Sequence, residues 1–560
     1  MAPVTRHSTT VRIAWTLAPL VLLAALALGA CAAPGAREPG SGEAMPHVRA
    51  HGVATQLIVD GKPFLILGGE LGNSTASDLG YLRRFWPLFD SLHLNTILAP
   101  VSWELIEPVE GRFDFSSVDG LVGQARAHGE RLVLLWFGSW KNSMSSYVPA
   151  WVKRDQARFP RSQLPDGRGI EILSPFSEEN RQADARAFAG LMAHLREVDA
   201  RRHTVLMVQV ENEVGMIPNA RDHSDVADAL FAGPVPGALL SYLASHRDSL
   251  APGLRERWES NGALMEGGWE RVFGSGAATE ELFMAWHFAT YVEAVAAAGK
   301  RAYPLPMFVN AALIRPGRLP GQYPSAGPLP HLIDVWRAGA PSIDFFAPDI
   351  YFPNFVEWAR AYALPGNPLF IPETGRNPVA TPANALFAIG RLDAMGFSPF
   401  AIERYQASDR LAEAYAVLQQ LAPLILEHQG DGSMVGVCPP VSFEGVVNDT
   451  AQEVRLGDYT LRVAFRNPFA RTPEPDVESR GGLIIQLGPE EYLIAGRGIT
   501  VTFSAAGATA GIESIREGQY IGGRWVPGRL LNGDESHQGR HLRIPEDRFG
   551  IQRVRLYRYH

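Results

Sequence analysis

The chain has 560 residues, of which 46% are hydrophobic and 20% charged, and its formal net charge is -8 at pH 7. This composition is that of an ordinary globular protein, and the length leaves room for one large domain and a smaller one. The acidic charge argues against nucleic acid or an anionic lipid surface as the main binding partner.

The amino terminus has the features of an export signal. Arg6 and Arg12 precede an apolar run that ends in Leu28-Gly29-Ala30-Cys31. These last four residues resemble the bacterial lipobox, in which the cysteine becomes lipidated and forms the new amino terminus. By this resemblance residues 1–31 are a signal peptide and Cys31 is the lipidation site. Ala32 after the cysteine implies the outer membrane of a Gram-negative bacterium, on its periplasmic or surface face.

Ordinary secretion and an uncleaved membrane anchor are the alternatives. The apolar run is near the lower length limit for a membrane span, and Thr16 and Pro19 interrupt it. Residues 32–46 are rich in proline, glycine and serine and predict a flexible tether. In the lipoprotein interpretation the membrane is contacted only through lipid. Cys438 is then the one cysteine left, which excludes an internal disulfide.

From residue 47 to about 425, short apolar runs alternate with longer helical patterns, which is typical of β-α units around a parallel sheet. The predicted strands are residues 64–69, 94–100, 132–138, 205–211, 306–311, 345–350, 369–373 and 399–403. The main helical patterns are residues 78–92, 118–128, 177–197, 282–300, 331–338 and 382–395. Eight such repeats predict a (β/α)8 TIM barrel. A doubly wound open sheet is the alternative, but no Gly-x-Gly-x-x-Gly follows the first strand.

Two further segments complete the predicted organisation. After strand four, residues 216–280 predict a long excursion that contains helices of its own. After a helix at 411–424 the pattern changes, and residues 430–560 contain short β-rich runs separated by turn residues such as Asn532-Gly533. We expect a smaller all-β domain here, built as a sandwich.

The carboxyl ends of barrel strands carry the chemistry in this fold. Acids, amides and aromatic residues collect at these positions, without histidine or cysteine: Glu70, Trp103, Glu211, Asn212, Glu213, Asn310, Asp349, Tyr351, Glu373 and Glu403. Hydrolysis of a glycosidic bond needs such a set. One carboxylic acid protonates the leaving oxygen, a carboxylate attacks the sugar carbon, and amides bind hydroxyl groups.

Glu213 and Glu373 are the predicted catalytic pair. They follow strands four and seven of an eight-strand ring, so they can face each other across its mouth. A retaining mechanism needs the two carboxyl groups about 5 Å apart, and an inverting one roughly 6.5–9.5 Å. Glu211 would share a face with Glu213 on a regular strand and brace the site. The remaining strand-end acids are interpreted as salt-bridge or surface residues, namely Glu104, Glu107 and Glu403.

The segment Gln209-Val210-Glu211-Asn212-Glu213-Val214-Gly215 resembles the Gln-x-Glu-Asn-Glu-aromatic-Gly signature of glycoside hydrolase family 35, the β-galactosidases, with Val214 in place of the aromatic residue. Residues 103–115 resemble the family's Trp-x-x-x-Glu-Pro-x-x-Gly-x-Phe-x-Phe. The run Phe370-Ile371-Pro372-Glu373 fits the strand-seven nucleophile of the clan. Residues 481–492 resemble a segment found in a bacterial branch of the family that carries an extra β domain.

This resemblance implies a retaining exo-β-galactosidase, with Glu213 as the acid/base and Glu373 as the nucleophile. Asn212 would hold the sugar 2-hydroxyl, and Glu70, Trp103 and Tyr351 would contact the sugar. A carbohydrate is then the partner, and no cofactor or metal is required. The alternatives are a β-glucoside, β-mannoside or α-L-arabinopyranoside as substrate, or a surface lipoprotein that binds carbohydrate without turnover.

Overall fold

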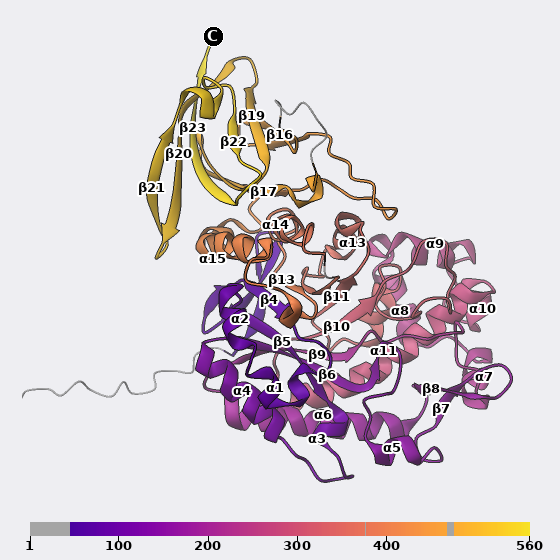
Figure 1. The fold of residues 1–560 in the computed structure, drawn as a ribbon. Coiled ribbons are helices and arrows are strands. Elements are labelled where there is room, and N and C mark those ends of the chain that lie inside the picture. The colour runs from indigo at the N-terminus through magenta and orange to yellow at the C-terminus, as the bar shows by residue number, and fades with distance from the viewer. Residues whose placement is uncertain (1–44, 376, 468–474) are drawn as a thin grey trace, which may run out of the picture. The chain divides into compact units, whose positions relative to one another are not determined.

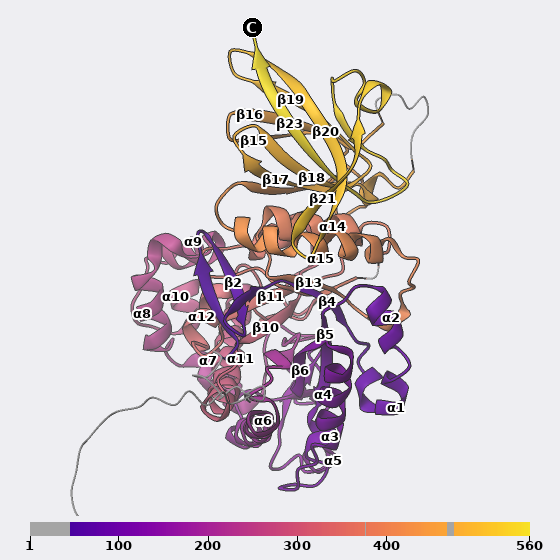
Figure 2. The ribbon, with the colours of Figure 1, turned by 90° about the vertical axis from the view of Figure 1, so that its left-hand side faces the viewer.

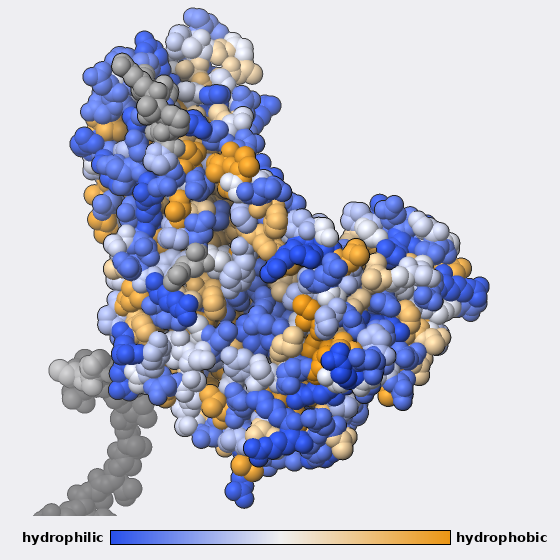
Figure 3. Space-filling model, turned by 45° about the vertical axis from the view of Figure 1, so that its right-hand side comes forward, coloured by the Kyte–Doolittle hydropathy of each residue, from blue (hydrophilic) through white to orange (hydrophobic). Residues whose placement is uncertain are grey.

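The computed structural model describes residues 45–375, 377–467 and 475–560, which belong to one compact unit. The predicted signal peptide, Cys31 and the tether up to residue 44 lie outside the described residues. Within those residues, every helix is too short or too polar to cross a membrane. On the face seen in Figure 3, hydrophilic residues predominate and the hydrophobic ones form small separate patches, as on an ordinary solvent-exposed surface.

Eight parallel strands close into a barrel in the order of the sequence, which confirms the predicted TIM-barrel fold class (Figure 1). They are β4 (Ile66–Glu70), β5 (Thr96–Ser102), β6 (Arg131–Lys141), β9 (Val205–Asn212), β10 (Met307–Ala312), β11 (Phe345–Ile350), β12 (Ile371–Thr374) and β13 (Gly396–Pro399). All eight residues of β9 are buried, as expected for a strand covered on both faces.

Helices and short turns surround the barrel. They are α1 (Leu79–Leu82), α2 (Trp86–Ser91), α3 (Trp103–Ile106), α4 (Ser116–His128), α5 (Ala150–Arg154), α6 (Glu178–Asp199), α11 (Ala277–Ala302), α12 (Ile333–Gly339), α13 (Phe355–Tyr362), α14 (Thr381–Arg391) and α15 (Arg410–His428). The excursion after β9 contains α7 (Asp225–Ala232), α8 (Gly237–Ser245), α9 (Pro252–Ser260) and α10 (Trp269–Phe273). Two small antiparallel sheets complete this part: β1 (His47–His51), β2 (Ala54–Val59) and β3 (Lys62–Phe64), and β7 (Arg161–Gln163) with β8 (Gly169–Leu173).

The predicted first helix and the predicted eighth strand differ from the structure. The helical pattern at 78–92 forms two short helices, because Pro87 has no backbone N–H to continue a helix and instead sits in the first turn of α2. The eighth strand ends at Pro399 rather than running to Glu403. Ala401 adopts a left-handed backbone with φ of 52°, and residues Ile402–Arg404 form a 3-10 turn.

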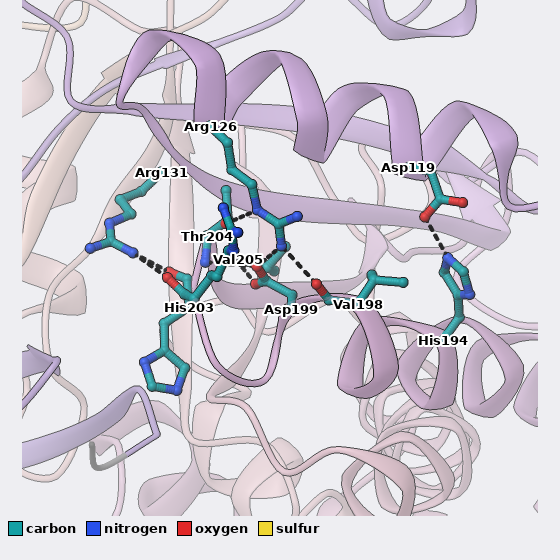
Figure 4. Close-up of polar contacts among 10 residues, drawn as sticks. Asp119, Arg126, Arg131, His194, Val198, Asp199, His203, Thr204 and Val205 are labelled. Atoms are coloured by element: carbon teal, nitrogen blue, oxygen red, sulfur yellow. Dashed lines mark hydrogen bonds and ion pairs between the residues drawn. The ribbon is translucent and has the colours of Figure 1, made fainter. Parts of the chain in front are cut away.

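The amino end of β9 is fixed by Asp199, the last residue of α6. Its buried carboxylate accepts hydrogen bonds from the backbone N–H groups of Thr204 (3.0 Å) and Val205 (2.7 Å) and pairs with Arg126 at 2.6 Å (Figure 4). The anchored strand holds its other end, which carries Asn212, at a fixed height in the barrel mouth.

The carboxyl-terminal part is all-β, as predicted (Figure 2). A six-stranded sheet has the order β14-β17-β18-β23-β20-β21, and a four-stranded sheet has the order β15-β16-β19-β22. The strands are β14 (Met434–Val437), β15 (Gln452–Leu456), β16 (Tyr459–Ala464), β17 (Gly481–Gly488), β18 (Glu491–Arg497), β19 (Ile499–Ala505), β20 (Thr509–Ile521), β21 (Arg524–Leu531), β22 (Leu542–Ile544) and β23 (Gly550–Tyr559). One apolar cluster contains residues of both sheets, as in a sandwich.

The six-stranded sheet is buried on both faces near β17. Ile484 points into the sandwich core, whereas its neighbours Leu483 and Ile485 belong to the core of the barrel part. Helix α14 lies against β14 and β17 and is buried along almost its whole length. The approach is close, because a side chain at Gly390 would collide with the backbone of Gly436.

Candidate active site

Four carboxyl groups gather at the barrel mouth. Glu70 ends β4, Glu213 follows β9, Asp349 lies in β11 and Glu373 in β12, and none is more than 6% exposed. One oxygen each of Glu213, Asp349 and Glu373 lies within 4.8 Å of the other two. The carboxyl group of Glu70 is near enough to those of Glu373 and Glu213 for their charges to repel one another. The predicted pair therefore faces each other across the mouth, as part of a larger acidic cluster.

One buried cation, Lys141 at the end of β6, accompanies these acids. Lys141 is only 4% exposed, and its ammonium group donates a hydrogen bond of 2.9 Å to Oδ1 of Asn212. The opposite charges of Glu373 and Glu213 raise the pKa of Lys141 against the lowering effect of burial. The ammonium therefore stays charged at neutral pH.

Burial raises the pKa of Glu213 to about 7, and the neighbouring Glu373 charge acts in the same direction. The charge of Lys141 and a hydrogen bond donated by the Asn142 amide oppose this shift. Burial also raises the pKa of Glu70 and of Asp349 well above the ordinary values. A carboxyl group with a pKa near 7 can give up and regain a proton at neutral pH, as an acid/base must.

Glu373 has a different environment from Glu213. The Tyr351 hydroxyl donates a hydrogen bond to Oε1 of Glu373, and the tyrosine is 47% exposed, so it borders the open mouth. Burial and the nearby carboxylate raise the pKa of Tyr351, which keeps the hydroxyl a donor. A hydrogen bond of this kind stabilises an ionised carboxylate, as a nucleophile requires.

The backbone around Glu213 is held by side chains of the next two strands. Its N–H donates to Oδ1 of Asn310 at 2.9 Å, and Nδ2 of Asn310 donates to Oδ2 of Asp349 at 2.5 Å. The φ angle of Glu213 is 46°, in the left-handed region that non-glycine residues rarely adopt. This strained backbone lies next to the proposed chemistry, where such conformations often occur.

The expectation that Glu211 and Glu213 share a face is wrong. Glu211 also has a left-handed backbone, with φ of 62°, which breaks the two-residue period of the strand. Its carboxyl group is fully buried and accepts a 2.8 Å hydrogen bond from the N–H of Trp140. Burial, and after it the nearby charge of Asp184, raise the pKa of Glu211 well above its ordinary value. Glu211 thus ties β9 to the residue before Lys141 and supports the site from behind.

The structure brings Glu70, Asn212, Glu213, Tyr351 and Glu373 together and leaves Trp103 outside. Trp103 is fully buried, and its indole N–H donates to Glu107 at 2.9 Å. Its ring packs edge-on against Trp151. The indole is used in packing, so these contacts give the predicted sugar contact of Trp103 no support.

Of the three acids interpreted as salt-bridge or surface residues, Glu104 fits that interpretation, whereas Glu107 is buried and, like Glu403, is held by hydrogen bonds. Glu104 pairs with Lys153 at 3.1 Å. Glu403 accepts hydrogen bonds from the N–H of Gly72 and the hydroxyl of Thr75. Glu107 holds Trp103 and also accepts from the N–H of Gly111.

An open cavity of about 1100 Å³ adjoins the site. The residues that line it include Gly72, two residues after Glu70, and also Tyr81, Arg84 and Phe400. The Phe400 ring lies 6.3 Å from that of Tyr351. Rings and a guanidinium group at this wall suit the alternating apolar and hydroxyl surfaces of a saccharide.

Lys141 and Asn142 were not among the residues singled out from the sequence. The third strand was predicted to end at residue 138, but β6 runs to Lys141. The available signal was a lone lysine directly after an apolar strand and Trp140, at the edge where the catalytic groups were expected. Asp349 and Asn310 were noted as strand-end residues without a role.

Residues 83–261, which include Lys141, Asn212 and Glu213, match the glycoside hydrolase 42 family model, described as beta-galactosidase. Residues 411–543 match the model described as a domain of unknown function, DUF5597. The β-galactosidase of Xanthomonas manihotis is 31% identical over 252 residues, which cover 42% of this chain and 37% of that protein. The chain thus spans well under half of this curated relative.

Similar solved structures include a β-galactosidase from the psychrophilic Marinomonas ef1, with 11% identity and a TM-score of 0.45 over 67% of this chain and 62% of that one. The catalytic domain of a β-amylase from Paenibacillus polymyxa has 10% identity and a TM-score of 0.45 over 63% and 98%. From the sequence matches, the chain joins a β-galactosidase-like barrel segment, similar to family 42 and not specifically to family 35, to a DUF5597 domain.

Proposed function

We propose that the protein is a retaining, exo-acting glycoside hydrolase that removes terminal β-galactose from oligosaccharides or polysaccharides. The observation that carries this proposal is the spacing of Glu213 and Glu373, whose carboxyl oxygens approach within 4.8 Å. Oxygens this close fit a pair in which one carboxylate attacks the sugar directly, as in retaining enzymes, whose carboxyl groups lie roughly 5–5.5 Å apart.

In the first step, a carboxylate oxygen of Glu373 attacks the anomeric carbon of the galactose and forms a glycosyl ester. The bond from this carbon to the leaving oxygen breaks, and Glu213 gives its proton to that oxygen. The raised pKa of Glu213, about 7, supports its role as the acid. The hydrogen bond from Tyr351 supports Glu373 as the carboxylate.

In the second step, Glu213 acts as a base and takes a proton from water. The water oxygen bonds to the anomeric carbon from the side that the leaving group occupied, and the ester bond to Glu373 breaks. Two inversions give a product with the original β configuration. Both carboxyl groups return to their starting protonation states, so no other reactant is needed.

The choice of galactose is supported by the β-galactosidase match of residues 83–261 and by the relative from Xanthomonas manihotis. The finer assignment to family 35 rests on the motif around Glu213, from which Val214 departs. A β-glucoside, β-mannoside or α-L-arabinopyranoside fits the same mechanism, and a non-catalytic carbohydrate-binding protein is the alternative of another class.

Proton NMR of the first sugar released from an aryl β-galactoside tests the mechanism. We expect the β anomer to appear first and the α anomer only later, through mutarotation. A first-formed α anomer would exclude the retaining pair. A panel of nitrophenyl glycosides tests the sugar, and the galactoside should be among the best substrates. Binding of galactosides with no turnover of any glycoside would favour the non-catalytic alternative.

We also propose that the chain is exported and anchored through lipid on Cys31, as the lipobox-like segment implies. With radiolabelled palmitate supplied to a Gram-negative host, the wild-type protein should be labelled and found in the outer-membrane fraction. A Cys31→Ala variant should lose the label. Equal membrane association without any label in the wild type would favour the uncleaved anchor instead.

A further inference from the structure

Lys141 is buried at the carboxyl end of β6, directly beside Asn212 of β9. The two residues are partners in the parallel pairing of these strands, and the Lys141 ammonium donates to Oδ1 of Asn212 at 2.9 Å. The neighbouring Phe137 ring lies 5.1 Å from the ammonium. The long lysine side chain is therefore enclosed, and its charged end is aimed at one atom of one amide.

An asparagine side chain has two ends of similar shape and opposite hydrogen-bonding character. A lysine ammonium has only donors, so the end of Asn212 that faces Lys141 must be the carbonyl oxygen. This leaves the Nδ2 group pointing elsewhere. Nδ2 of Asn212 is buried and has no hydrogen-bond partner among the described residues. An unpartnered buried donor is costly, so this group is ready for an acceptor from outside the chain.

We propose that Lys141 is a positioning residue that locks the Asn212 amide in the orientation in which Nδ2 donates to a substrate hydroxyl next to the reacting carbon. The inference rests on the proposed glycosidase function and deepens it. Without Lys141, the amide can rotate and present its carbonyl oxygen, or can turn its donor toward the carboxylates. The hydroxyl contact, which strengthens in the transition state, is then lost for much of the time.

A purely electrostatic role is the competing explanation. Lys141 faces four acidic groups, in decreasing order of effect Glu373, Glu213, Glu70 and Asp349. Its charge offsets their mutual repulsion in a dry site. If this were its whole task, removal of Lys141 would weaken the activity toward every substrate alike. The positioning role instead predicts a loss that depends on one hydroxyl group of the substrate.

The test compares a 4-nitrophenyl β-galactoside with its 2-deoxy analogue in the wild type and in Lys141→Met. In the wild type, loss of the hydroxyl should lower kcat/KM at least about 100-fold, since the contact with this group strengthens in the transition state. In Lys141→Met the same comparison should give less than about a 10-fold loss. The intrinsic reactivity of the two substrates cancels when the two ratios are divided.

Three variants sharpen the result. Asn212→Ala should show the same insensitivity to the hydroxyl, and adding Lys141→Met to it should not reduce the sensitivity further. Lys141→Arg, which keeps the charge and the donors, should recover part of the sensitivity. Lys153→Met is the matched control, because this partly exposed lysine pairs with Glu104 and should leave both ratios unchanged.

The pH profile gives a readout that folding defects do not imitate. Lys141 lowers the pKa of Glu213, so the alkaline limb of kcat/KM should move to higher pH in Lys141→Met. If Lys141→Met does not fold, Lys141→Leu, which also removes both the charge and the donors, takes its place. A folded variant with the full wild-type sensitivity to the hydroxyl overturns the inference. A wild type that hydrolyses no aryl glycoside overturns the proposed function instead.

Discussion

Replacing Glu213 with glutamine should lower kcat/KM for galactosides with poor leaving groups by about 10²- to 10⁴-fold, because general acid catalysis contributes that much. Substrates with good leaving groups, which need little protonation, should lose less in the first step. The alkaline limb near the pKa of Glu213, about 7, should disappear with the carboxyl group. Steady-state kinetics against pH with a series of aryl galactosides measures both effects.

Azide provides the chemical complement to this variant. In Glu213→Ala or Glu213→Gly the missing side chain leaves room for the anion, which needs no general base to attack the glycosyl ester. We expect activity to return and the product to be a β-galactosyl azide of retained configuration. Glu104→Gln is the control, since this acid lies in a partly exposed ion pair with Lys153. Full activity of Glu213→Gln without azide would remove Glu213 from the mechanism.

Replacing Glu373 with glutamine should have the larger effect, a loss of at least about 10⁴-fold in kcat with every leaving group, because an amide cannot form the glycosyl ester. Azide should not restore a retained product here. A thermal melt and circular dichroism should show a folded protein, because the amide keeps the volume of the carboxylate and can still accept the hydrogen bond from Tyr351.

Mass spectrometry can identify the nucleophile directly. A galactoside that is fluorinated at carbon 2 and carries a good leaving group forms the ester and then hydrolyses slowly. After digestion of the labelled protein, the added sugar should be found on the peptide that contains Glu373. A label on Glu70, whose charge acts on Glu373, would instead assign the attack to this neighbouring acid.

The barrel could be predicted because its signal is strong and local. Apolar runs such as the one in β9 are unambiguous when both faces of a strand are buried, and the order of the runs fixes the ring. Once the ring was known, the carboxyl ends of strands four and seven had to meet, which brought Glu213 and Glu373 together. Position alone also pointed to Glu70 and Tyr351.

The predictions that were wrong or incomplete concern features that only the three-dimensional structure shows. The face of Glu211 followed a two-residue period that its left-handed backbone breaks. The sequence around Trp103 does not show whether its indole contacts a sugar or, as in the structure, Glu107. The role of Lys141 depends on four acids from other strands and on Asn212. The residues next to Lys141 in the sequence give no sign of these contacts.

The burial of α14 has a consequence for how this architecture can change. A helix on the outside of a barrel usually turns one side to water, but β14 and β17 cover that side of α14, and Gly390 and Gly436 bring the two backbones close. The all-β part therefore cannot be removed as a separate domain. Truncation of the chain after α15 would expose the apolar side of α14 to water. The sequences of the loops at the barrel mouth can change without affecting this interface, whereas the barrel and the all-β part must be kept together.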